Sequence, residues 1–299
     1  MKIEQFLRKE QQKALSLGKE ESAVIIYMMH ITGYSSSELY LHMSDKVSDD
    51  ILSKFETEFK SYLYDNKPIQ YIVGYQTFYG YDFNVDDRVL IPRFETEELV
   101  ENILAFYDEY FNGQKVQVCD IGTGSGAIGI TLALEEKNME VYATDISSQA
   151  LEVARSNNEK FKANVTFLQG DMVKPLYGKK FDVIVSNPPY IPDSEYVEEL
   201  VKENEPNIAL FGGNDGLKFY RIIIEDAAKI AKEKFIMGFE HGYNKNAEIE
   251  ALILKQFPNA KVIHKKDMQG KDRMTFAIVG DFNEWNFNIS NWYSLWNGC

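Results

Sequence analysis

The sequence predicts an α/β domain with a mostly parallel sheet, preceded by a small helical bundle domain and a β-hairpin linker. From about residue 95 to 280, short apolar runs typical of strands alternate with longer amphipathic stretches typical of helices. Residues 1–66 show apolar residues at helical spacing only. We therefore predict a helical domain at 1–66, a linker at 67–94 and an α/β domain at 95–280. Residues 281–299 are rich in Asn and Trp and match no element.

The elements follow from local patterns. Glycines and acidic residues separate three short β-like runs in the linker, at 71–74, 77–83 and 88–91. Thr96 and the acidic residues beside it suit the start of a helix. The predicted strands are 116–121, 140–144, 165–168, 181–185, 235–239, 260–264 and 274–279, with helices that include 147–160 and 216–232. Such alternation is typical of a sheet with helices on both faces.

Composition limits the class of partner. A hydrophobic fraction of 44% supplies a core, and the net charge of −14 disfavours a protein that grips nucleic acid through phosphates. No apolar run approaches the roughly 18–20 residues that span a bilayer, and the first ten residues do not resemble a signal peptide. The two cysteines form no disulfide framework or metal motif. We expect a cytoplasmic protein, without metal or membrane contact, that acts on a protein or a small molecule.

A glycine-rich segment follows the first strand of the α/β domain. Gly124, Gly126 and Gly129 match the G-x-G-x-x-G pattern of nucleotide sites, which is a weak signal by itself. Asp145 ends the next strand, where an acid can bind both hydroxyls of a ribose. The alternative is that Asp145 forms a turn or caps the helix after Ser147. Together, the segment and the acid favour a site for an adenosine-containing cofactor.

Asp120 indicates which cofactor this is. We expect its carboxylate at the mouth of the glycine loop, where it would repel a pyrophosphate and attract a sulfonium or an ammonium group. S-adenosylmethionine carries both cations and no phosphate, so the pattern D-x-G-x-G-x-G favours it over NAD. Asp171, after the third strand, is expected near the adenine, with Met172 as a soft apolar contact.

The fourth strand ends in the sequence Ser-Asn-Pro-Pro-Tyr-Ile-Pro. We call residues 187–190 the proline corner. The Asn187 side-chain oxygen and the Pro188 carbonyl can accept the two hydrogens of an NH₂ group, and Tyr190 offers a face to a planar group. Such a site suits a poorly nucleophilic planar nitrogen that is aimed at a methyl donor. The alternative is a simple tight turn.

These motifs resemble those of class I methyltransferases that act on planar nitrogens. Further segments narrow the resemblance to the HemK/PrmC family of peptide chain release factor glutamine methyltransferases: 68–74, 90–97, Glu205-Pro206 with Ala209-Leu210, 213–217 and Glu240-His-Gly242. The resemblance covers residues 1–280. It departs at Phe94, where the family usually has proline, and in the tail.

The resemblance implies a Rossmann-like fold and methylation of the glutamine in the Gly-Gly-Gln loop of class I release factors. It implies that the cofactor contacts Asp145, Met172, Asn187 and the loop residues Gly122, Thr123, Gly124, Ser125 and Gly126. It also implies that Asn187, Pro188, Pro189 and Tyr190 hold the glutamine, and that the helical domain binds the release factor.

Two other functions fit parts of the sequence. An adenine amino-group methyltransferase on DNA or RNA would use the same corner, but it needs a basic channel that this acidic chain does not predict. A sensor that binds S-adenosylmethionine without catalysis has no need of Asn187-Pro-Pro-Tyr190.

Overall fold

The sheet of the α/β domain positions the candidate site. The computed structural model describes residues 1–282. Seven strands form this sheet in the order β5-β4-β3-β6-β7-β9-β8. They are β3 (Val116–Ile121), β4 (Met139–Asp145), β5 (Val165–Gln169), β6 (Phe181–Ser186), β7 (Ala231–Glu240), β8 (Lys261–Lys266) and β9 (Asp272–Val279). The pairs among β3 to β7 are parallel, and β9 is antiparallel to both neighbours, which confirms the predicted mostly parallel sheet.

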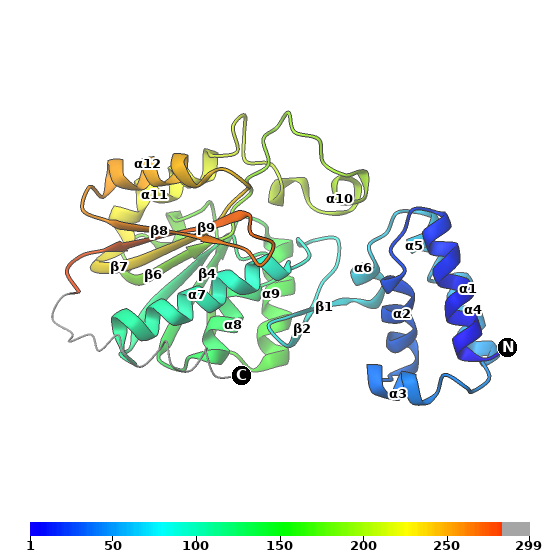
Figure 1. Cartoon of the computed structure of the whole chain (residues 1–299). Helices are drawn as coiled ribbons and strands as arrows, with labels where there is room; N and C mark the ends of the chain where they lie inside the picture. The colour runs from blue at the N-terminus through cyan, green and yellow to red at the C-terminus, as the bar shows by residue number, and fades with distance from the viewer. Residues whose placement is uncertain (283–299) are drawn as a thin grey trace.

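Helices cover both faces of the sheet (Figure 1). One apolar cluster joins the sheet to α7 (Phe94–Phe111) and α8 (Ala127–Glu135). A second cluster joins the opposite face to α11 (Lys218–Ile230) and α12 (Asn246–Gln256). The central strand β6 is buried along its whole length, as expected for a parallel strand covered on both sides. The remaining helices of this domain are α9 (Ser148–Phe161) and α10 (Glu199–Asn204).

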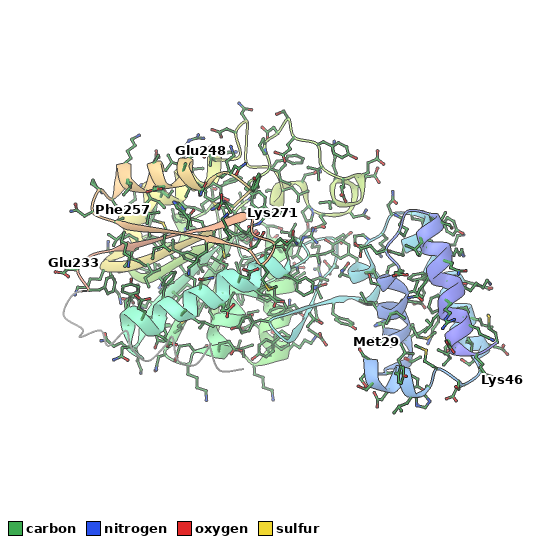
Figure 2. All side chains as sticks on the ribbon, viewed as in Figure 1. Met29, Lys46, Glu233, Glu248, Phe257 and Lys271 are labelled. Carbon is green, nitrogen blue, oxygen red and sulfur yellow. The ribbon has the colours of Figure 1, made fainter. Side chains whose placement is uncertain are left out.

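The N-terminal part is helical, as predicted. Its helices are α1 (Ile3–Ser16), α2 (Ser22–Thr32), α3 (Ser36–Leu41), α4 (Asp49–Thr57), α5 (Lys60–Tyr64) and α6 (Ile69–Val73). Serine side chains cap two of them, because Ser35 Oγ accepts from Glu38 N and Ser48 Oγ from Ile51 N. Figure 2 shows Met29 and Lys46 in this part, and Glu248, Phe257 and Lys271 in the sheet domain. The helices enclose an apolar cluster of their own.

The linker differs in part from its prediction. The hairpin is present as β1 (Tyr75–Phe78) and β2 (Tyr81–Asn84). The predicted β-like run at 71–74 is wrong, because α6 lies there and buries Ile69 and Val73 against the helical cluster. The predicted run at 88–91 forms no strand; it begins in a turn, where Val89 N donates to the Asp86 carbonyl, and it buries Val89 and Ile91. Tertiary packing, and not local β propensity, determines the conformation of both segments.

The other elements lie where the sequence predicts them, within a few residues. Helix α7 begins at Phe94, with Glu95 and Glu97 in its first turn near the positive end of the helix dipole. Among residues 1–282, no helix is both long and apolar enough to cross a membrane. The predicted tail at 281–299 lies largely outside the described residues, which end at Phe282.

Candidate active site

The glycine loop joins β3 to α8. Gly122 and Gly124 have φ angles of 76° and 56°, a left-handed conformation that residues with a side chain rarely adopt. A Cβ built on either residue would meet no protein atom within 4 Å, and both residues line a cavity. A ligand can therefore lie directly against this backbone.

Asp120 lies beneath the loop and not at its mouth, so its predicted position is wrong. Its side chain alternates with its neighbours along β3 and points to the face that α8 covers, where it is fully buried. Oδ2 accepts hydrogen bonds from Thr123 Oγ1 (2.5 Å) and Gly129 N (3.0 Å). Burial raises the pKa of this carboxyl to about 7. Asp120 thus braces the loop, and its contact with a cofactor stays a prediction.

Asp145 links the loop to the next strand. Its Oδ2 accepts from Gly124 N and its Oδ1 from Ser147 N, both at 2.9 Å. Asp145 therefore forms the turn that was the alternative to a role in ribose binding. It does not cap α9, because Ser147 Oγ does so by accepting from Ala150 N. Burial raises the pKa of Asp145. Its carboxylate lines the cavity, where a ligand hydroxyl can still donate to it.

Asp171 and Met172 line the cavity beyond Asp145. Asp171 forms an ion pair with Lys174 at 2.6 Å. Met172 has a φ of 48°, and its carbonyl accepts from Thr144 Oγ1 at 3.0 Å, which ties this turn to the end of β4. The carboxyl ends of three parallel strands thus bring predicted cofactor residues to one cavity.

The proline corner lies beside the glycine loop because β6 pairs with β3. The strand order reverses at this pair, which is where open α/β sheets bind ligands. Ser186 Oγ donates to the carbonyl of Ile121 at 2.6 Å and joins the two strand ends. Asn187 and Pro189 line the cavity, and Asn187 Nδ2 donates to Thr96 Oγ1 at 3.2 Å.

Two glycines from a later loop pack directly against the corner. A Cβ on Gly212 would lie 2.5 Å from the Pro189 carbonyl oxygen, and one on Gly216 would lie 2.3 Å from the Tyr190 carbonyl oxygen. Gly212 N also donates to the Ile191 carbonyl at 2.8 Å. Only glycine permits this close approach, so residues 212–216 support the shape of the corner.

Besides the buried Asp120, three predicted site residues do not line the cavity. Gly126 precedes α8, with a φ of 86° and no room for a Cβ beside Ile130. Pro188 lies between two residues that do line the cavity. Tyr190 packs against the second apolar cluster, and burial raises its pKa to about 12. The roles predicted for these three remain predictions.

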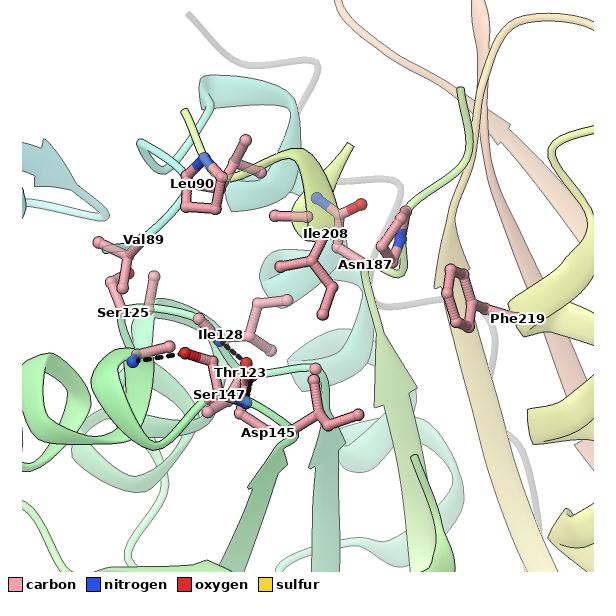
Figure 3. A pocket seen from close by; sticks show the side chains of 18 of the residues that line it. Val89, Leu90, Thr123, Ser125, Ile128, Asp145, Ser147, Asn187, Ile208 and Phe219 are labelled. Atoms are coloured by element: carbon pink, nitrogen blue, oxygen red, sulfur yellow. Dashed lines mark hydrogen bonds between the residues drawn. The ribbon is translucent and has the colours of Figure 1, made fainter. Parts of the chain in front are cut away.

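The whole cavity has a volume of about 430 Å³. Its walls include residues that the sequence motifs did not identify as ligands. In Figure 3, Val89 and Leu90 from the linker lie across the cavity from Phe219 on α11, with Ile208 near Asn187. Some of these residues fall within the segments of family resemblance, at 90–97 and near Ala209, but no local pattern marks them as cavity walls.

The cavity fits S-adenosylmethionine. Its volume lies within the range of small-molecule sites, about 300–1,000 Å³. The open glycine backbone, two carboxylates and the apolar side chains of Ile146 and Met172 suit an amino acid group, a ribose and an adenine. Residues 98–208 match the family model "Methyltransferase small domain". A methyltransferase structure from Pyrococcus furiosus shares the fold, with a TM-score of 0.51 at 21% identity over 68% of this chain and 91% of its own. Fold and cavity define a class I, S-adenosylmethionine-dependent methyltransferase.

Sequence comparison identifies the family within this class. Residues 5–74 match the model "PrmC N-terminal domain". The release factor glutamine methyltransferase of Bacillus cereus is 43% identical over 264 residues, which cover 87% of this chain and 93% of that protein. That of Bacillus subtilis is 44% identical over 267 residues, which cover 88% and 92%. The chain belongs to the release factor glutamine methyltransferase family.

Proposed function

We propose that the protein methylates the side-chain amide nitrogen of the glutamine in the Gly-Gly-Gln loop of class I peptide chain release factors. The observation that carries the proposal is that Asn187 and Pro189 of the proline corner line the cavity, beside the glycine loop. An amide nitrogen is a weak nucleophile, since its lone pair is delocalised into the carbonyl. A site for it needs hydrogen-bond acceptors and a fixed approach more than it needs a strong base.

Residues of this chain have separate parts in the reaction. Gly122 to Ser125, Asp145, Asp171 and Met172 would hold S-adenosylmethionine. When bound, this cofactor supplies an electrophilic methyl group. Asn187 Oδ1 and the Pro188 carbonyl would accept the two amide hydrogens and orient the nitrogen lone pair. The new nitrogen–carbon bond would replace the bond between the methyl group and the donor sulfur, which would leave as a neutral thioether. The nitrogen would release one proton to solvent, and acceptors on its hydrogens favour this change in the transition state.

The N-terminal helices form the proposed binding domain for the release factor. They contain none of the cavity residues, and Tyr40 and Leu41 on α3 expose three quarters or more of their surface. Because α6 packs with these helices, we propose the domain boundary near Gly74 and not at residue 66. The acidic chain supports a protein substrate over nucleic acid, and we expect the reaction in the cytoplasm.

The experiment compares three substrates with labelled S-adenosylmethionine: a class I release factor, a duplex DNA and an rRNA fragment. We expect label on the release factor alone, on the glutamine of its Gly-Gly-Gln loop by mass spectrometry. A release factor with that glutamine changed to asparagine is the matched control and should stay unlabelled. Label on an adenine amino group would support the nucleic-acid alternative instead.

A further inference from the structure

Two buried residues outside the corner form a hydrogen-bonded line with Asn187. Thr96 lies in the first turn of α7, and Glu240 ends β7. Asn187 Nδ2 donates to Thr96 Oγ1 at 3.2 Å, and Thr96 Oγ1 donates to Glu240 Oε2 at 2.6 Å. Thr96 is 5% exposed and Glu240 is 2% exposed, so water does not compete for these contacts. Neither residue has a part in the reaction described above.

The line determines which end of the Asn187 amide faces the substrate. A threonine hydroxyl has one hydrogen, and here that hydrogen goes to the carboxylate of Glu240. The Thr96 oxygen can then only accept from the amide, and the carboxylate of Glu240 also accepts a hydrogen bond from the Asn187 side chain. The nitrogen of Asn187 is therefore held, and its oxygen is turned to the cavity. We propose that Thr96 and Glu240 are positioning residues that orient Asn187 so that its oxygen accepts from the substrate amide. This inference rests on the proposed function.

The surroundings of Glu240 connect this orientation to pH. The charged and titratable groups that face it are Arg273 on β9, Glu95 on α7, Tyr190 in the corner and Tyr220 on α11. Burial raises the pKa of Glu240 to about 7. A protonated Glu240 would donate to Thr96 Oγ1, and the Thr96 hydrogen would then favour the oxygen of Asn187. The amide would turn over, so the chemical step should accelerate as pH rises through about 7.

The test uses Thr96→Val, which keeps the shape and removes the hydroxyl, and Thr96→Ser, which keeps the hydroxyl. We expect Thr96→Val to lower kcat at least about tenfold with little change in KM for S-adenosylmethionine, because an Asn187 that is no longer oriented loses its hydrogen bond to the reacting amide in the transition state. Thr96→Ser should restore kcat to within about threefold of the wild type. Thr131→Val is the matched control, because Thr131 Oγ1 is buried on α8 and has no hydrogen-bond partner among the described residues. The kcat of Thr131→Val should equal that of the wild type.

A wild-type kcat in Thr96→Val, or equal damage in Thr96→Ser, overturns the inference. The pH profile gives a second test, since Glu240→Gln should flatten the rise of kcat near pH 7. If the wild type leaves the release factor unmethylated, the proposed function is wrong. Nuclear magnetic resonance can then still test whether Thr96 and Glu240 orient Asn187. The side-chain NH₂ signals of Asn187, identified by their loss in Asn187→Ala, should shift near pH 7 in the wild type and not in Glu240→Gln. Signals that do not shift with pH in the wild type contradict it.

Discussion

The glycine loop after β3 and the proline corner after β6 lie side by side, but different parts of the chain support them. The loop is held by Asp120 and Thr123, within three residues of each other, and by Asp145 at the end of the next strand, 21 residues after Gly124. The corner is held by Thr96, 91 residues away from Asn187, and by the glycines of the 212–216 loop. The supports of the loop thus come from β3 itself and the next strand β4, whereas the corner also depends on Thr96, which comes from the start of α7. We propose that the loop binds the cofactor and that the corner controls the chemical step.

The largest effect is expected at Asn187. Asn187→Ala removes the proposed acceptor and should lower the single-turnover rate about 10²–10³-fold, with cofactor affinity little changed. Asn187→Asp keeps an acceptor but adds a negative charge near the sulfonium, so it should retain the cofactor and react slowly. Calorimetric titration and rapid-quench methylation measure the two quantities. Equal losses of affinity and rate in Asn187→Ala would remove the distinction between loop and corner.

Gly216→Ala tests the remote support of the corner. The added Cβ would lie 2.3 Å from the Tyr190 carbonyl oxygen, so the corner must move. A shift of about 1 Å at such a site costs about 100-fold in rate. Gly178→Ala is the matched control, since Gly178 has a φ of 86° and no atom within 4 Å of its Cβ position. It carries the same conformational strain without the clash, and it should lose stability but not rate. A comparable rate in the two variants would show that the corner does not need the 212–216 loop.

Asp145→Ala tests the loop. It removes a charge-assisted acceptor from the proposed ribose site and the hydrogen bond to Gly124 N. Cofactor affinity should fall by about 1–3 kcal/mol. Calorimetric titration with S-adenosylmethionine measures this change, and Asp145→Asn, which keeps one acceptor oxygen, should lose less. Unchanged affinity in Asp145→Ala would exclude Asp145 from the site.

The last effect concerns the stability of the fold and not the reaction. Burial raises the pKa of Asp120 from 3.8 to about 7, so the folded protein holds this proton more tightly than the unfolded chain does. The free energy of unfolding should therefore decrease as pH rises from about 4 to about 7. Asp120→Asn cannot titrate, so its stability should decrease less over the same range. Urea unfolding at pH 5 and pH 8 measures both proteins, and an identical decrease would contradict a buried, titrating Asp120.

The same difference between local and remote support explains what the sequence could predict. The glycine loop, Asp145 and Asn187 lie at the ends of strands whose apolar runs the sequence shows directly, and Gly122 to Ser125, Asp145 and Asn187 line one cavity. Other residues reach the site only through contacts between segments that lie far apart in the sequence: Val89, Ile208, Thr96 and Glu240. No local sequence pattern predicts such contacts. Residues 71–74 show the converse: their short apolar run suits a strand, but packing against the helical cluster makes residues 71–73 the end of α6, which Gly74 caps.

The most direct test of the division between loop and corner is a cofactor titration of the single-turnover methylation rate in Asp145→Ala and Asn187→Ala. Saturating S-adenosylmethionine should restore Asp145→Ala to nearly the wild-type rate, because only binding is impaired. The rate of Asn187→Ala should stay low at every cofactor concentration. Full recovery of Asn187→Ala at high cofactor, or no recovery of Asp145→Ala, would contradict the account.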